Sequence, residues 1–142
     1  MVYLKRPLWV IKTERLGFRR LTHEDYDSLH HILGDAATMY AWEYGFSDEQ
    51  IIEWINKNLM RYEKDGFAYH AAIDKASGEL IGVMGALIEN IDGTEQIGIG
   101  YIVAKKHWGK GYATEGARAW IQYAFEQLGA ARVIADIRPE NT

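Results

Sequence analysis

The chain has 142 residues, of which 48% are hydrophobic and 25% are charged, and its formal net charge is −4. This length and balance predict one soluble globular domain, 1–142, with a core of its own. The acidic charge argues against a nucleic-acid partner, the apolar run 80–88 is too short to cross a membrane, and the lack of cysteine excludes disulfides, thiolate metal sites and a cysteine nucleophile.

The first half of the chain is predicted to hold one strand followed by two helices. Residues 13–21 alternate between two faces, which is typical of a strand. Two capping boxes follow, in which a hydroxyl residue and a residue three positions later cap each other's backbone N–H groups. The box at 22–25 predicts a short helix that ends at Gly34, and the box at 47–50 predicts a helix over about 48–64.

The second half is predicted to hold an antiparallel meander, a helix and a last strand. Asp92-Gly93 is a strong hairpin signal, and the helix carries apolar residues at three- and four-residue spacing until Gly129 stops it. The last strand should run parallel to the strand before the helix, through a right-handed crossover. The expected strands cover 67–74, 79–91, 94–103 and 132–138. Together these elements predict an α+β fold in which helices flank a mixed, mostly antiparallel sheet.

Two glycines, Gly109 and Gly111, lie where the strand 94–103 gives way to the helix. A helix start offers unpaired backbone N–H groups and a partial positive charge, and glycine lets a ligand approach them closely. This combination suits a phosphate or pyrophosphate, and nearby lysines add positive charge. A tight strand-to-helix turn without a ligand produces the same spacing, so both interpretations stay open.

Four short stretches of the chain carry a family pattern. Gly100–Val103, Trp108–Glu115 and Arg138–Asn141 together resemble the GNAT superfamily of acyl-CoA N-acyltransferases. The opening Thr13–Leu16, with the residues that follow it, is similar to the ribosomal-protein N-acetyltransferase-like branch. The resemblance implies a GNAT-like fold and the transfer of an acetyl group from acetyl-CoA to a primary amine, on a protein N-terminus or a small molecule.

The resemblance also implies where acetyl-CoA would bind. Its pyrophosphate would accept hydrogen bonds from backbone N–H groups between Gly109 and Ala113, and its pantetheine arm would pair with the backbone edge of Ile102–Ala104. Lys106 stands where the superfamily often has glutamine or arginine, so positive charge is kept but bidentate hydrogen bonding is lost. The expected cofactor-binding residues are Ile102, Val103, Ala104, Lys106, Trp108, Gly109, Lys110, Gly111, Tyr112, Ala113 and Asn141.

The general base is not carried over from the family. A glutamate often precedes the Gly-Tyr pair by two residues in this branch, and here that position is Gly98. Glu95 and Glu89 are the substitutes that we predict, with Glu95 placed first although it points to the opposite strand face unless a bulge intervenes. His70 and a water relay to a backbone carbonyl are the alternatives. Glu95, Glu89 and His70 each also suit an ordinary position, on the solvated surface or in a structural hydrogen bond.

Three other features of the sequence bear on the function. A dinucleotide fingerprint is disfavoured because Thr114 stands where the third glycine belongs. No metal is expected, since the spacing of His23, His30 and His31 matches no ligand pattern. The aromatic side chains between the two first helices either belong to the core or line the acceptor site, as the resemblance implies. They are Tyr40, Trp42, Tyr44 and Phe46.

The end of the sequence shapes the last expectations. The resemblance implies that Asn141 begins a further helix followed by a hairpin, which the 142 residues do not include. We therefore expect weak acyl transfer and self-association through the C-terminal strand 132–138, whose edge and apolar face would be exposed. A non-catalytic CoA-binding or interaction module is the alternative function. A cytoplasmic location is expected, since the N-terminus has no signal peptide and cysteine is absent.

Overall fold

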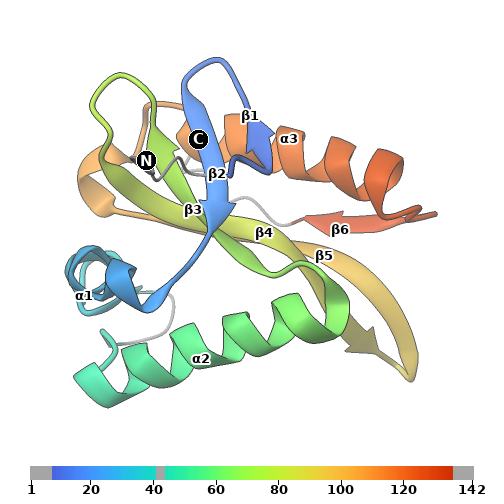
Figure 1. Ribbon diagram of the computed structural model, residues 1–142, viewed down its shortest axis with the longest axis horizontal. Helices are drawn as coiled ribbons and strands as arrows, with labels where there is room; N and C mark the ends of the chain where they lie inside the picture. The colour runs from blue at the N-terminus through green and yellow to red at the C-terminus, as the bar shows by residue number, and fades with distance from the viewer. Residues whose placement is uncertain (1–7, 41–43, 136–142) are drawn as a thin grey trace, which may run out of the picture.

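The computed structural model describes residues 8–40 and 44–135, which form one six-stranded sheet with helices on both faces (Figure 1). The strands lie side by side in chain order, and every neighbouring pair is antiparallel except β5 and β6, which are parallel as predicted. The strands are β1 (Ile11–Lys12), β2 (Leu16–Arg20), β3 (Tyr69–Asp74), β4 (Leu80–Ile91), β5 (Thr94–Val103) and β6 (Val133–Ala135). The helices are η1 (His23–Asp25), α1 (Tyr26–Leu33), α2 (Asp48–Asp65), η3 (Lys105–His107) and α3 (Tyr112–Gln127). The predicted α+β arrangement is confirmed.

The predicted helix starts in the first half are also confirmed. Thr22 with Asp25, and Ser47 with Gln50, form complete capping boxes at the starts of η1 and α2. Gly66 ends α2 at a φ of 86°, a left-handed conformation that glycine adopts without strain. The first helical segment differs from the prediction in one respect, because it begins as the tight turn η1 and only then continues as α1.

The first strand is shorter than predicted. Thr13 and Leu16 close a turn in which the Thr13 N–H donates to the Leu16 carbonyl at 2.8 Å, so β2 begins only at Leu16. The turn folds the preceding residues back as β1, a strand that the sequence did not predict. Gly17 is needed here, since a Cβ on it would come within 2.6 Å of the Trp9 ring.

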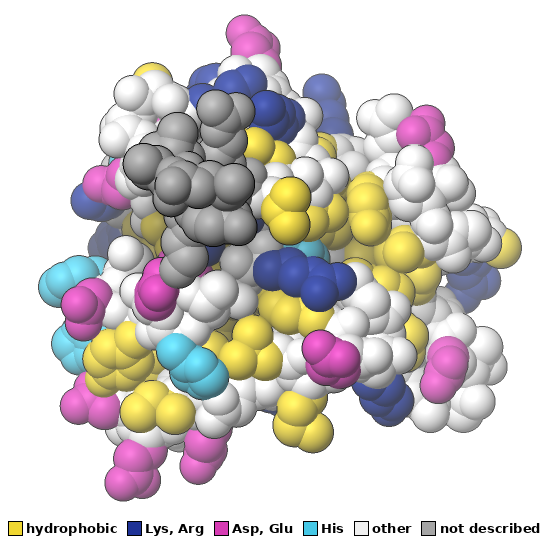
Figure 2. All heavy atoms as spheres, in the orientation of Figure 1, with side chains coloured by type: hydrophobic (Ala, Val, Ile, Leu, Met, Phe, Trp, Pro, Cys, Tyr) yellow, Lys and Arg dark blue, Asp and Glu magenta, His cyan; other side chains and the backbone are white. Residues whose placement is uncertain are grey.

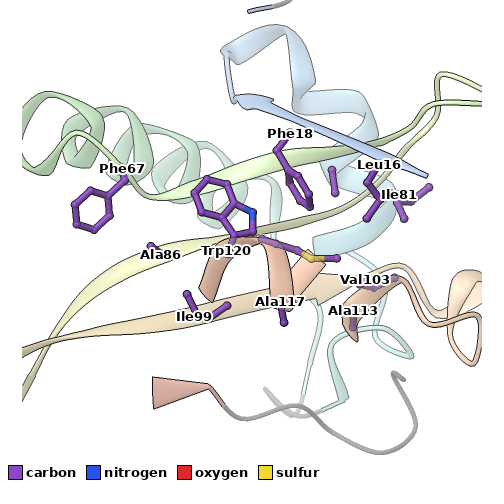
Figure 3. Packing of buried hydrophobic residues seen from close by; sticks show 12 residues of the cluster. Leu16, Phe18, Phe67, Ile81, Ala86, Ile99, Val103, Ala113, Ala117 and Trp120 are labelled. Carbon is purple, nitrogen blue, oxygen red and sulfur yellow. The ribbon is translucent and has the colours of Figure 1, made fainter. Parts of the chain in front are cut away.

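One face of the sheet packs against α3 (Figure 3). Trp120 is fully buried, and its ring meets Phe18 edge to face with the centroids 5.6 Å apart. Gly116 allows α3 to approach closely, because a Cβ there would overlap the sulfur of Met84. This core fixes α3, and with it the loop that precedes the helix, against the middle of the sheet. Its other buried members are Leu16, Phe67, Ala72, Ile81, Ala86, Ile99, Val103, Ala113 and Ala117.

The opposite face packs against α1 and α2, which lie below the sheet in Figure 1. Successive residues of a strand point to opposite faces. Thus β5 contributes Ile99 and Val103 to the α3 side and Ile102 to the α2 side. Gly98 and Gly100 share the face of Ile102, so the two glycines lie on the side of α1 and α2. The buried members of this core are Leu21, Leu29, Ile32, Leu33, Met39, Ile51, Ile55, Ala71, Ile73, Val83, Ile102 and Ala104.

Candidate functional site

The loop between β5 and α3 contains two glycines in the left-handed conformation. Gly109 has a φ of 78° and Gly111 a φ of 81°, both in the left-handed region that side chains with a Cβ disfavour. Gly111 is the residue that precedes the first turn of α3, and no side chain caps this helix start. The start of α2 is different, since the Ser47 side chain accepts from the Gln50 N–H and the Gln50 side chain accepts from the Ser47 N–H. The first N–H groups of α3 are therefore not capped by a side chain, and an anion is the kind of ligand that would suit such groups best.

The lysines around the loop differ in whether their charge is paired with a carboxylate. Lys106 Nζ lies 3.0 Å from Glu79 Oε1, and His107 Nε2 lies 2.5 Å from Glu79 Oε2. The hydrogen bonds from His107 and Lys106 hold the pKa of Glu79 below its usual value, so this carboxylate stays ionised beside the loop. The charge of Lys106 is thus directed to Glu79. Lys110, which lies between the two glycines, is exposed, as is Lys105 at the start of η3.

A hydrogen bond from Trp108 connects the loop to the end of β5. Its indole N–H donates to the Val103 carbonyl at 2.7 Å, and its ring meets Tyr40 edge to face at 5.7 Å. The Ala104 N–H donates to the Ile81 carbonyl of β4 at 2.9 Å. Backbone N–H and C=O groups alternate in direction along a strand. The N–H of Ala104 therefore points toward β4, and the backbone groups of Val103 point away from it. Of the predicted pairing segment Ile102–Ala104, only Val103 has its backbone groups on the outer edge.

The segment before β2 is bonded to the first turn of α3. The Glu115 carboxylate accepts from the Thr13 hydroxyl at 2.5 Å, from the Arg15 backbone N–H at 2.9 Å and from Arg15 Nε at 2.7 Å. Burial opposes ionisation of Glu115, but these hydrogen bonds and the charge of Arg15 lower its pKa overall. The sequence analysis assigned no function to Arg15 or Glu115. Their presence in two of the stretches that carry the resemblance was the signal that could have linked them.

The two glycines of β5 make room for side chains from neighbouring strands. A Cβ built on Gly98 would lie 2.9 Å from Glu89 Oε2, and one built on Gly100 would lie 2.5 Å from the Tyr69 hydroxyl. Glu89 pairs with Gln96 across the hairpin, so its carboxylate reaches diagonally to Gly98. The structure therefore puts a carboxylate directly above the position where the family resemblance led us to look for a glutamate.

Tyr69 is held firmly beside that carboxylate. Its backbone N–H donates to Asn58 Oδ1 at 3.1 Å, its carbonyl accepts from the Tyr62 hydroxyl, and its ring lies 5.2 Å from the ring of Trp54. Burial raises the pKa of Tyr69 to about 12, and the charge of Glu89 adds to this effect. The phenol is therefore neutral at ordinary pH and can donate a hydrogen bond. The sequence analysis did not identify Tyr69, because only the strand register brings it over Gly100.

The other predicted base candidates lie elsewhere. Residues of β4 and β5 pair without interruption from Gly82–Val103 to Ile91–Thr94, so no bulge turns Glu95 toward Glu89. Glu95 lies on the α3 side, at a surface cavity of about 610 Å³ that Leu128 and Gly129 also line. His70 is 1% exposed, its Nδ1 is 2.8 Å from the Ala68 carbonyl, and burial lowers its pKa to about 4. His70 is thus a neutral core residue at ordinary pH.

The remaining predicted residues are spread over the surface or lie outside the described ranges. Trp42 and Asn141 belong to the segments that the structure does not describe, while Tyr40 and Tyr44 are exposed and Phe46 packs on the α2-side core. Figure 2 shows acidic and basic side chains interspersed over the viewed face, so binding of an anion depends on local groups. Within 8–40 and 44–135, no cluster of three potential metal ligands is found and no helix has the length and hydropathy to span a membrane.

Comparison with known proteins identifies an acetyltransferase family. The model of the acetyltransferase (GNAT) domain matches residues 15–142. The N-acetyltransferase p20 of Bacillus licheniformis is 34% identical over 136 residues, which cover 92% of this chain and 74% of that protein. The crystal structure of a GNAT-family acetyltransferase from Bacillus anthracis is 30% identical, with a TM-score of 0.74 over 92% of this chain and 75% of the other. A ribosomal-protein alpha-N acetyltransferase in complex with coenzyme A, 19% identical, shares the fold with a TM-score of 0.70 over 94% of this chain and 77% of the other.

Proposed function

Because the chain belongs to the GNAT acetyltransferase family, we propose that it transfers the acetyl group of acetyl-CoA to a primary amine, on a protein N-terminus or a small molecule. The observation that carries this proposal is the start of α3, which follows two left-handed glycines and has no side-chain cap. The converging N–H groups at such a helix start favour the negative charge of a pyrophosphate.

The proposed position of acetyl-CoA follows from that helix start. The pyrophosphate would lie against the N–H groups of Gly109 to Ala113, with Lys110 beside it. The pantetheine arm would run along the outer edge of β5, where the Val103 N–H points away from β4. This path leads the thioester toward Gly100, on whose α2 side the Tyr69 hydroxyl lies, with the Glu89 carboxylate over Gly98 on the same face. The proposed cofactor contacts are thus mostly with backbone atoms.

We assign the general base to Glu89. An amine arrives protonated at neutral pH, and its nitrogen must lose a proton before it can attack the thioester carbon. Glu89 would accept that proton, the nitrogen would form the C–N bond, and the C–S bond would break as the sulfur leaves with its electron pair and takes the second proton of the nitrogen. The neutral Tyr69 phenol would donate a hydrogen bond to the acceptor or to the developing oxyanion. Glu89 comes from β4 and Tyr69 from β3. Because Gly98 and Gly100 have no side chains, both residues can extend over the same face of β5.

A second function keeps the CoA site without the chemistry. Gly98 occupies the position where the family resemblance led us to look for a glutamate, and this favours a non-catalytic CoA-binding module. The two functions make different predictions for one experiment. The purified chain is incubated with acetyl-CoA and a panel of amines, including peptide N-termini and small polyamines, while free thiol and acetylated product are measured. An enzyme releases thiol in step with acetylated amine.

Calorimetric titration with CoA completes the test. Binding without acetylated product supports the module, whereas binding with product supports the acetyltransferase. If CoA does not bind to the folded chain, the assignment of the α3 start is wrong and both functions fall. The prediction that the chain self-associates through 132–138 stays a prediction, and light scattering on the same sample tests it.

A further inference from the structure

One arginine side chain joins the turn before β2 to the start of α3. Arg15 Nη1 donates to the Lys110 carbonyl at 2.9 Å, and Arg15 Nε lies 2.7 Å from Glu115 Oε1. Its guanidinium carbon lies 4.3 Å from the centre of the Tyr112 ring, above which it is stacked. Arg15 therefore contacts the loop residue between the glycines, the first helical residue and the first acidic residue of α3.

We propose that Arg15 is a positioning residue for acyl-CoA, which holds the loop in its phosphate-accepting conformation and cancels the charge of Glu115. This inference rests on the proposed function, because it assigns a task within the same site. In the bound state, the pyrophosphate would meet N–H groups that Arg15 has already oriented. Arg15 acts through the loop and needs no direct contact with the ligand.

The first part of the argument concerns the direction of one peptide group. A trans peptide is planar, and its C=O and N–H point in opposite directions. When Arg15 holds the Lys110 carbonyl, it also directs the Gly111 N–H to the side away from the guanidinium. Gly111 is left-handed and carries no side chain, so contacts made by its neighbours must fix this peptide. The hydrogen bond from Arg15 does so at the point where a phosphate would accept.

The second part concerns charge. Glu115 lies in the first turn of α3, where a carboxylate stabilises the helix but repels an anionic ligand. Its side chain is only 18% exposed, so water screens its charge poorly. The bonds from Thr13 and Arg15 keep it ionised while Arg15 supplies the opposite charge 2.7 Å away. Removal of Arg15 would leave a fixed negative charge beside the proposed pyrophosphate.

The chain offers a matched control in a second arginine pair. Arg19 Nη1 and Nη2 bind both carboxylate oxygens of Asp25 at 3.0 and 2.8 Å. This pair joins β2 to the end of η1 and contacts no residue of 108–113 among the contacts described. Loss of the Arg19 pair should lower the stability of the fold. It should leave the proposed CoA site unchanged.

The test compares the CoA affinity of five variants by calorimetry at a temperature where each is folded. Arg15→Gln should weaken CoA binding about tenfold to a hundredfold, the equivalent of one charge-assisted hydrogen bond. Arg15→Gln/Glu115→Gln should recover part of the loss, because no unpaired carboxylate remains. Arg15→Lys keeps the charge without the planar fork and should fall between wild type and Arg15→Gln. Glu115→Gln alone should bind CoA at least as well as wild type, whereas Arg19→Gln should lower the melting temperature and keep the Kd within twofold.

Kinetics and hydrogen exchange give readouts that a purely structural contact would not change. In an active chain, Arg15→Gln should raise the KM for acetyl-CoA more than it lowers kcat. It should also speed amide exchange at 109–115, whereas Arg19→Gln should not. A Kd within twofold of wild type for folded Arg15→Gln, or equal losses for Arg15→Gln and Arg19→Gln, would overturn the proposal. If wild type does not bind CoA, the proposed function fails, and unchanged exchange at 109–115 in Arg15→Gln then overturns the positioning of the loop as well.

Discussion

The assignment of Glu89 as general base is open to a direct test by substitution. Glu89→Gln keeps the size of the side chain and removes its ability to accept a proton. General base catalysis contributes about 10²–10⁴ in rate. Because Glu89 is exposed, water can take over part of the proton transfer, and we expect a loss near the lower limit, about a hundredfold in kcat. CoA affinity should stay unchanged, since Glu89 lies on the α2 face rather than at the start of α3.

The short distance between position 98 and the Glu89 carboxylate allows a more specific experiment. A Cβ at position 98 would lie 2.9 Å from the Glu89 carboxyl carbon, so a glutamate at 98 would start where the Glu89 side chain now ends. In Glu89→Ala/Gly98→Glu the carboxylate therefore returns to the same face from the neighbouring strand. We expect this double variant to recover part of the rate that Glu89→Ala loses. Gly98→Ala alone should lower turnover, because the new methyl group displaces the Glu89 carboxylate.

The assay is thiol release at saturating acetyl-CoA with an amine that the wild-type chain accepts. Glu53→Gln, an exposed carboxylate on α2, serves as the control for loss of surface charge. If Glu89→Gln keeps its kcat within about threefold of wild type, the base is not Glu89. A large loss in Glu95→Gln instead would show that the sequence analysis had placed the right residue first.

Two other predictions concern the loop and the core. Gly111→Val should abolish CoA binding measured by calorimetry, because a valine at this position would be strained at a φ of 81°; Gly93→Val, equally strained at a φ of 79° in the hairpin turn at the other end of β5, should bind CoA normally, and equal binding by both variants would refute the site. His70 should make stability depend on pH, since burial lowers its pKa to about 4 in the folded chain from about 6.5 in the unfolded chain. The neutral form is favoured by folding, so this contribution is complete above pH 6.5 and is lost as the pH falls toward 4, at up to about 1.4 kcal/mol per pH unit. Urea denaturation between pH 5 and 7 measures this slope, which His70→Phe should flatten and the exposed His23→Gln should not; equal slopes in wild type and His70→Phe would contradict the assignment.

Much of the fold was predictable because its signals are local. The capping boxes at 22–25 and 47–50 involve residues three positions apart, and the Asp92-Gly93 turn is set by two residues that tolerate a positive φ. The conformation of the 109–111 loop is likewise a property of its own glycines. Such signals are contained in a few neighbouring residues, so a single sequence is enough to read them.

The parts that the sequence did not predict depend on distant residues. The β1 strand pairs with β2 where the Trp9 ring lies over Gly17, and neither residue indicates the other in the sequence. Glu89 reaches Gly98 only through the register of β4 and β5. For Gly98 the sequence showed only that the glutamate frequent at this position in the branch is missing. The structure shows that a side chain from the next strand fills the space, and that this chain carries a carboxylate there after all.

The bonds between Arg15 and Glu115 span 100 positions of the chain, and this separation bears on how the molecule assembles. Contacts within hairpins can form as soon as their strands exist, whereas a contact between remote residues carries a large loop-closure entropy and forms late. During synthesis, the β3–β4–β5 meander can pair before α3 has been made, and the loop at 109–111 cannot be held by Arg15 until α3 has docked. Substitutions of Arg15 should therefore speed unfolding more than they slow refolding, which stopped-flow measurements in denaturant would show. The CoA site would then be among the last parts of the fold to form and among the first to open.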